Sequence, residues 1–277
     1  MTTAPRSVEH RITALMTDPD LFRPGNPIHS TDAAREYGYE GALVGGVTIY
    51  AWTIPTILEA LGERWLSDGW VDVMFRRPTY PNQQMTIRVT EGEDGISDLA
   101  MTNDEGATAV SGQVGLGKAP WLDDLQLPVR RAPEPKLASV SRLTLAEAPV
   151  GQDLRPMSVP VTAEDVRKWA SGDVAVTDPR FTEGDRPLLH PGWIAARMES
   201  LAHHSYDYSP AIHTRSQVQH LAPARADQTL TAAGRMSSAY ERKGHHYYEM
   251  DAMLFAEHGE ELARFRHTSI FQVAKRA

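Results

Sequence analysis

Two short segments of this sequence hold residue types that could do acid–base chemistry beside the start of a helix. The first is Asn26-Pro27-Ile28-His29, which a polar loop separates from Gly45-Gly46 at the head of an apolar segment. The second is His190-Pro191-Gly192, which is followed by Glu199. A histidine with a pKa near ~6.5 can exchange protons at neutral pH, and the free N–H groups of a helix N-terminus favour negative charge. Both segments therefore suit reactions in which an oxyanion forms.

The first segment can be given working roles. His29 is the candidate general base, and Asn26 would orient its loop or a water molecule. The backbone N–H of Gly46 is the candidate oxyanion donor, because a glycine lets a substrate approach the helix closely. Arg76 and Arg77 come at the end of an expected strand. They are candidate substrate-binding cations, because guanidinium groups bind phosphates well.

The composition of the 277 residues excludes several classes of protein. Lys and Arg number 28 against 36 Asp and Glu, a net charge of -8, which argues against a general nucleic-acid binder. The absence of cysteine excludes disulfides, thiolate metal sites, iron–sulfur clusters and a cysteine nucleophile. The 11 histidines include the pairs His203-His204 and His245-His246. Adjacent histidines point to different faces, and the sequence holds no His-Glu-x-x-His spacing, so we expect no metal site.

One uncharged segment, residues 42–58, is 17 residues long, the short limit for a membrane span. It contains Gly45, Gly46 and Pro55, and Glu40 and Glu59 flank it. A helix buried on all sides, running to about residue 65, explains it better. The N-terminal segment carries charges where a signal peptide needs an apolar stretch. We therefore expect a cytoplasmic protein that does not enter a membrane.

Turn residues and β-forming residues divide the rest of the chain into a repeated pattern. Thr162 to Asp165 is a typical helix start, with a threonine N-cap and an acid three residues later. Residues 118–156 carry six prolines and read as a surface linker. Four strands are expected before the linker, at 70–75, 85–90, 97–102 and 107–116. A strand at 158–161, a helix at 192–206 and strands at 214–221, 229–239, 246–256 and 261–273 are expected after it.

The two halves of the chain can be aligned on each other. Four residues that follow the first long helix recur 145 positions later, and the same order of elements surrounds them. This indicates an internal duplication of an α+β unit. The expected organisation is an N-terminal unit at 1–117, the linker at 118–156 and a C-terminal unit at 157–277. The recurring residues are Val73, Pro78, Gln83 and Thr86, which match Val218, Pro223, Gln228 and Thr231.

A long apolar helix wrapped by an antiparallel sheet, present twice in one chain, resembles the double hotdog fold. The Asn26-Pro27-Ile28-His29 motif ahead of Gly45-Gly46 resembles the MaoC-like (R)-specific enoyl-CoA hydratases and dehydratases. In these proteins an Asp-x-Asn-Pro-x-His loop precedes a His-Gly pair at the helix start. The resemblance implies an α+β double hotdog that adds water to, or removes it from, an acyl thioester. The acyl group would be carried by CoA or an acyl carrier protein, and no metal or redox cofactor would be needed.

Both copies depart from the family motif. The motif aspartate falls at Pro24 in the first half, so His29 lacks its usual acidic partner. Asp32 is the nearest acid and could take over this role. The second half keeps the run into the motif, ending at Asp173, but the Asn-Pro-x-His that should follow is missing.

The second half also resembles a different enzyme pattern. Hotdog thioesterases carry His-Gly-Gly with an acid seven residues after the second glycine, and Glu199 stands seven residues after Gly192. Glu199 would act there as base or nucleophile on a thioester carbonyl held by the Gly192 N–H. Two alternatives to the hydratase therefore stay open, namely this thioesterase and a repurposed, non-catalytic double hotdog. The fold would allow a monomer or a homodimer of pseudo-dimers.

Overall fold

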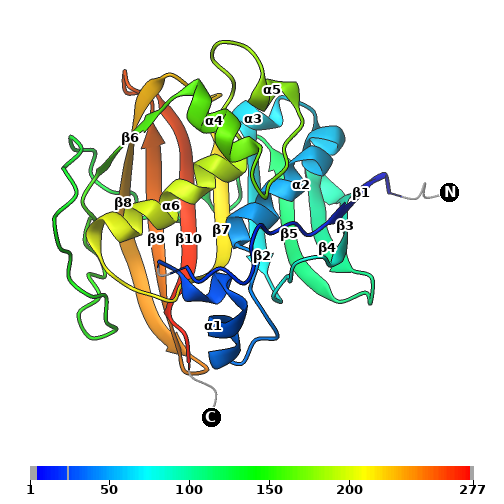
Figure 1. Ribbon diagram of the computed structural model, residues 1–277. Helices are drawn as coiled ribbons and strands as arrows, with labels where there is room; N and C mark the ends of the chain where they lie inside the picture. The colour runs from blue at the N-terminus through cyan, green and yellow to red at the C-terminus, as the bar shows by residue number, and fades with distance from the viewer. Residues whose placement is uncertain (1–4, 24, 275–277) are drawn as a thin grey trace.

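The computed structural model describes residues 5–23 and 25–274. One ten-stranded antiparallel sheet curves around two long helices (Figure 1). The strands are β1 (Ser7–Thr13), β2 (Gly69–Phe75), β3 (Gln84–Glu91), β4 (Ile96–Asn103), β5 (Thr108–Leu116), β6 (Met157–Val161), β7 (Ile212–His220), β8 (Gln228–Arg242), β9 (His245–Phe255) and β10 (Glu261–Gln272). The helices are α1 (Thr31–Glu36), α2 (Gly46–Leu61), α3 (Trp65–Asp68), α4 (Ala163–Ala170), α5 (Pro179–Thr182) and α6 (Pro191–Ser205).

The strand order reads the same from both edges of the sheet. It runs β1-β3-β4-β5-β2 through the first half and β7-β10-β9-β8-β6 through the second. The two central strands, β2 and β7, pair antiparallel from Trp70 with Gln219 to Met74 with Arg215. The Arg215 Nε donates to Asp72 Oδ1 across this joint at 2.8 Å. The sheet is therefore continuous through the middle of the molecule, and it joins the two halves of the chain.

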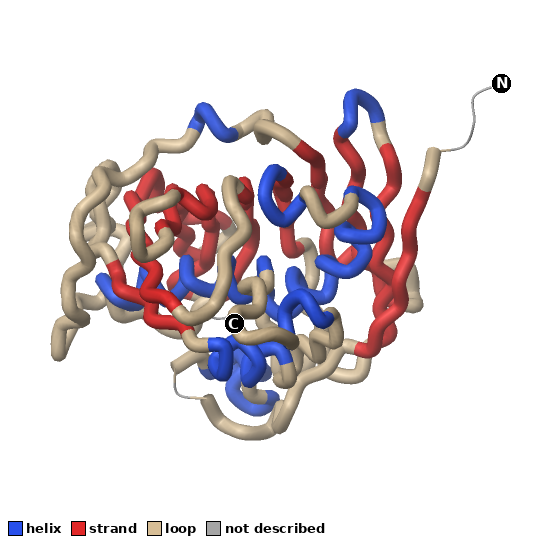
Figure 2. The backbone as a smooth tube through the Cα atoms, turned by 90° about the horizontal axis from the view of Figure 1, so that it is seen from above, coloured by secondary structure: helices blue, strands red, loops and turns tan. Residues whose placement is uncertain are grey.

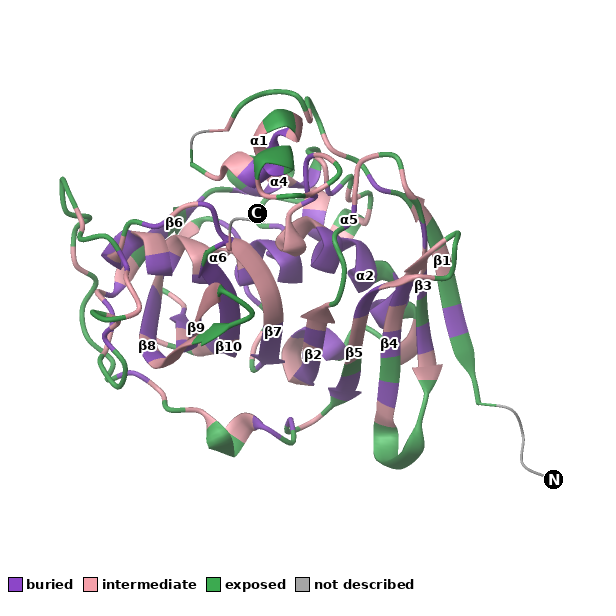
Figure 3. Cartoon of the chain, turned by 90° about the horizontal axis from the view of Figure 1, so that it is seen from below, coloured by how far each residue is buried: buried purple, intermediate pink, exposed green. Residues whose placement is uncertain are grey.

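Helices α2 and α6 occupy the concave side of the sheet, where the buried residues gather (Figures 2 and 3). Nine consecutive or near-consecutive residues of α2 are buried, from Ile49 to Leu58, which explains why the segment carries no charge. The expectation that this helix reaches residue 65 is wrong, because Gly62 ends it in a left-handed conformation with φ of 80°. No helix in the described part of the chain is long and apolar enough to cross a membrane.

One sequence expectation is confirmed among the remaining elements. The capping box at Thr162 and Asp165 opens α4, with both reciprocal hydrogen bonds formed. The linker runs over the outside of the sheet, and the Gln126 N–H donates to the Asp251 carboxylate at 2.6 Å. Four elements were not expected, namely β1, α1, α3 and α5. Strand β1 pairs with β3 although it carries three ionisable residues, and α1 lies in the loop that was expected to be irregular.

Candidate active site

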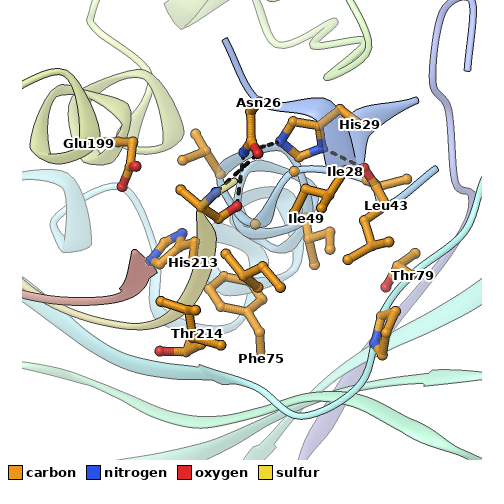
Figure 4. A pocket seen from close by; sticks show the side chains of 18 of the residues that line it. Asn26, Ile28, His29, Leu43, Ile49, Phe75, Thr79, Glu199, His213 and Thr214 are labelled. Atoms are coloured by element: carbon orange, nitrogen blue, oxygen red, sulfur yellow. Dashed lines mark hydrogen bonds between the residues drawn. The ribbon is translucent and has the colours of Figure 1, made fainter. Parts of the chain in front are cut away.

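A pocket of about 390 Å³ opens at the N-terminus of α2. Figure 4 shows its polar side chains around an apolar wall that includes Ile28, Leu43 and Phe75. Both halves of the chain line it, because α6, β7 and β10 reach it from the second half. Six residues predicted from the sequence meet there: Asn26, His29, Gly46, Arg76, Arg77 and Glu199.

His29 lies at the end of a 3-10 turn, Pro27–His29. Each of its two ring nitrogens has a hydrogen-bond partner. Its Nδ1 lies 2.6 Å from the Leu43 carbonyl oxygen, which can only accept, so Nδ1 carries the proton. Its Nε2 is therefore an acceptor, and the Asn26 side-chain amide donates to it at 3.1 Å. Burial lowers the pKa of His29. The ring is consequently neutral near pH 7, with its basic nitrogen on the pocket side.

Asn26 is oriented from the other half of the chain. The Ala211 N–H donates to Asn26 Oδ1 at 3.1 Å, and Asn26 Nδ2 donates to the Ala211 carbonyl at 2.9 Å. This pair of bonds fixes which end of the amide is the donor, and so it fixes the contact with His29. Asn26 thus ties the loop that carries His29 to the segment just before β7.

Helix α2 begins at Gly46 with Gly45 as its N-cap, so no side chain satisfies the first N–H groups from the cap position. A Cβ at Gly46 would lie 2.9 Å from His213 Nδ1 and 3.0 Å from His213 Cβ. A Cβ at Gly45 would lie 3.7 Å from His29 Cε1. Two imidazoles thus flank the helix N-terminus, and glycine at position 46 gives the His213 ring the room to pack directly against the first turn of α2.

The Glu199 carboxylate faces the pocket from α6 and contacts four donors. Its Oε1 accepts from the Tyr208 hydroxyl at 3.0 Å and lies 3.4 Å from His203 Nε2. Its Oε2 accepts from the Tyr248 hydroxyl at 3.1 Å and from His267 Nε2 at 3.2 Å. Burial raises the pKa of Glu199, but the bonds from His203 and His267 outweigh it and hold this pKa below its usual range. Four contacts occupy the lone-pair sites that a base or nucleophile would use.

The matching position at the start of α6 is closed. The Gly192 N–H donates to the Nδ1 of His190, its own N-cap, at 3.1 Å. A Cβ at Gly192 would lie 2.7 Å from the Ala51 Cβ. A cavity beside Pro191 measures about 10 Å³, which is about one water molecule. Gly192 therefore does not meet Glu199 in a substrate pocket, which corrects the expected pairing of the two.

Two other acidic candidates lie elsewhere. Asp32 is fully exposed on α1 and pairs with Arg35 at 3.5 Å, so it does not take the place of the missing motif acid in the pocket. Asp173 accepts hydrogen bonds from the N–H and hydroxyl of Thr17, which ties down the N-terminal segment. Pro24 lies outside the described residues. Within the described ranges, no cluster of three His, Asp or Glu side chains is arranged to hold a metal ion.

Sequence reasoning missed two pocket histidines, His213 on β7 and His267 on β10. Their rings lie 4.4 Å apart, and the hydroxyl of Ser216 lies between their nitrogens. Ser216 and His267 are direct partners in the β7–β10 register, so the sheet pairing itself brings them together. Only knowledge of that pairing could have revealed them, because the two histidines stand 54 positions apart along the chain.

This chain is similar to known proteins in structure, but no match is found from its sequence. No family model matches the sequence, and a search of curated proteins finds no match. Among solved structures, one from Mycobacterium tuberculosis that is described as a double hotdog matches with a TM-score of 0.61, 10% identity and coverage of 97% of this chain and 96% of that one. This chain has the double hotdog fold. The fold expected from the sequence is confirmed.

Other structural neighbours differ in assigned activity. A protein of Chloroflexus aurantiacus assigned as a MaoC domain dehydratase matches with a TM-score of 0.66 and 13% identity, covering 100% of this chain and 97% of that one. A protein of Lactobacillus plantarum assigned as an oleoyl thioesterase matches with a TM-score of 0.51 and 10% identity, covering 97% of each chain. At identities this low, structural similarity shows the fold alone. The reaction must therefore be inferred from the residues of the pocket.

Proposed function

We propose that this double hotdog is a hydratase or dehydratase that acts on an acyl thioester. The observation that carries the proposal is the position of His29. A neutral imidazole with an acceptor Nε2 stands beside the open N-terminus of α2, in a pocket with an apolar wall. This combines a base with an oxyanion donor, which hydration of an enoyl thioester requires.

In the hydration direction the thioester oxygen would bind the Gly46 N–H at the helix start. A water molecule would displace the Asn26 amide from His29 Nε2 and give its proton to that nitrogen. Its oxygen would then bond to the β-carbon, while the electrons of the double bond move to the thioester oxygen. A general acid in the pocket then protonates the α-carbon as the enolate electrons return to that carbon, and His29 releases its proton to solvent, which completes the addition. Arg76 and Arg77, which line the same pocket, would bind phosphates of the acyl carrier.

The contacts of Glu199 weigh against the thioesterase alternative. A carboxylate that accepts from two tyrosines and lies beside two histidines has no free lone pair with which to attack a carbonyl. What favours hydrolysis is that Glu199 nonetheless lines the pocket with Gly46, whose N–H could serve in place of that of Gly192. Thioesterases are also among the structures with this fold. The two reactions give different products and can be separated directly.

The test is mass spectrometry after incubation with a panel of enoyl-CoA and saturated acyl-CoA thioesters. We expect the enoyl thioesters to gain one water with the thioester intact. His29→Ala should lower this rate by about 10²-fold or more, the usual contribution of a general base. His258→Ala is the matched control, because His258 is exposed in the turn between β9 and β10. Free acid and free CoA as the products would instead establish the thioesterase.

A further inference from the structure

His213, which belongs to none of the predicted motifs, has an unused nitrogen at the centre of the site. It lines the pocket from β7, next to Glu199 in Figure 4. Its Nδ1 is buried and has no hydrogen-bond partner among the residues that the structure describes. Buried polar atoms are normally paired, and an exception at a pocket points to a ligand that completes it. The same Nδ1 is the atom nearest to a Cβ built on Gly46.

The other nitrogen of His213 determines what this Nδ1 can do. His213 Nε2 lies 3.2 Å from the Arg215 carbonyl oxygen, which only accepts, so Nε2 carries the proton and Nδ1 has a free lone pair. His213 Nε2 also lies 2.7 Å from the Ser216 hydroxyl. That hydroxyl can accept from His213 and pass its own hydrogen onward.

The chain of contacts continues to a fixed negative charge. Ser216 Oγ lies 3.5 Å from His267 Nδ1, and His267 Nε2 donates to Glu199 Oε2 at 3.2 Å. His213, Ser216, His267 and Glu199 thus form a continuous path, called here the relay. It leads from the pocket beside α2 to a carboxylate that stays ionised, since the bonds from its neighbours hold the pKa of Glu199 low.

We propose that His213 is a second catalytic base, which removes and returns the proton on the α-carbon of a bound acyl thioester. This rests on the proposed thioester substrate but not on the addition of water. It predicts a separate activity, the exchange of α-hydrogens of saturated acyl thioesters with solvent. Ser216, His267 and Glu199 are positioning residues that accept the proton's charge.

The step balances without a co-reactant. The α C–H bond breaks, its proton bonds to His213 Nδ1, and its electron pair forms an enolate whose oxygen accepts from the Gly46 N–H. The Nε2 proton of His213 moves to Ser216 Oγ, and the Ser216 hydrogen moves to His267 Nδ1. The positive charge then lies on His267 against the Glu199 carboxylate. Reversal after exchange with solvent returns a different hydrogen to the carbon, with no net redox change.

Position assigns this role to His213 rather than His29. The residue that would hold the thioester oxygen is Gly46, which His213 touches, while His29 lies against Gly45. The α-carbon is bonded to the thioester carbonyl carbon, so a base near Gly46 is near the α-hydrogen. Besides its relay partners, His213 packs against the Phe75 ring, with centroids 4.6 Å apart. Burial lowers the pKa of His213, which keeps its lone pair free at neutral pH.

The experiment is incubation of a saturated acyl-CoA panel in D2O, with mass spectrometry of the intact thioester. We expect one deuterium to enter the wild-type product. His213→Gln, which is similar in size but not basic, should slow exchange by about 10²-fold or more. His258→Gln, an exposed histidine, is the control. Ser216→Ala leaves the imidazole in place and should lower kcat for exchange at least about tenfold with KM unchanged, and Ser216→Thr should restore it.

The outcomes separate this inference from the proposed function. No exchange by the wild type, or exchange that survives in both His213→Gln and Ser216→Ala, overturns the inference even if hydration is found. Exchange that is lost in these variants supports it even if no substrate is hydrated, in which case the hydratase proposal fails alone. If His213→Gln does not fold, the Ser216→Ala and Ser216→Thr pair decides the question.

Discussion

Replacement of Glu199 by glutamine is the sharpest perturbation of the site, because it keeps the shape of the side chain and removes its charge. One oxygen becomes an NH2 group that must face two of the four donors. The less costly orientation places it toward Tyr208 and His203, because His203 is one-third exposed and can reach water, while Tyr248 and His267 are buried. A buried donor without a partner costs about 1–3 kcal/mol. Tyr208 can partly recover by donating to Tyr248, whose oxygen lies 3.1 Å away.

The loss of charge weakens the bonds from Tyr248 and His267 as well, so we expect Glu199→Gln to destabilise the protein by about 2–4 kcal/mol. The pH dependence has a definite sign. The pKa of Glu199 in the folded protein lies below its ordinary 4.5. The stabilisation that the ionised Glu199 gives the folded protein is therefore fully present above pH 4.5, and it is lost as the pH falls through the pKa of Glu199 in the folded protein. The difference between the wild type and Glu199→Gln should therefore be constant from pH 6 to 8 and shrink in acid.

Urea unfolding followed by tryptophan fluorescence measures this difference, with Glu257→Gln as an exposed control. A Glu199→Gln variant as stable as the wild type at pH 7 would refute the arrangement of four donors. If that stable variant also lost thioester hydrolysis, Glu199 would be a free catalytic carboxylate.

Three further predictions concern the pocket and its closed counterpart. Gly46→Ala should lower hydration kcat/KM by more than about tenfold in a steady-state assay, with Gly25→Ala as an open-space control, because the methyl group meets His213. Because burial lowers the pKa of His29, the acid limb of the kcat/KM profile should lie below pH 6.5, and a limb above that value would show that His29 is not the base. Burial lowers the pKa of His190 to about 3. Between pH 6.5 and 3 the unfolded chain therefore binds a proton at His190 that the folded protein does not, so the unfolding free energy decreases as the pH falls through this range. His190→Asn should flatten the pH dependence of the unfolding free energy over that range.

The repeated elements could be predicted from the sequence because they are set by local patterns. The alternation of apolar residues predicts where the strands lie, and turn residues such as Glu257-His258-Gly259 predict where they end. Strand β1 could not be predicted, because a strand at the edge of a sheet, with one solvent-facing side, can carry the charged residues of Ser7–Thr13. The helix end at Gly62 follows the common pattern of a glycine after an apolar run, so the sequence does carry the signal for an end before residue 65.

The site was harder to predict because its parts come from both halves. Local motifs identified Asn26, His29 and Gly46, which one loop and one helix start bring together. Glu199 was assigned to a separate site with Gly192, because sequence order gives no sign that α6 faces the N-terminus of α2. The partnership of Ser216 with His267 depends on the β7–β10 register, which a single sequence does not reveal.

The pairing of β2 with β7 has a consequence for how the pocket persists in dilute solution. Two separate subunits would form such a joint only above their dissociation constant, and a pocket shared between them would disassemble on dilution. Here residues 118–156 tether the halves, so the effective concentration of one half around the other is fixed by the length of the chain. Because the start of α6 is filled, we expect each chain to bind a single ligand at this shared site, with an occupancy that follows the ligand concentration and does not fall when the protein is diluted.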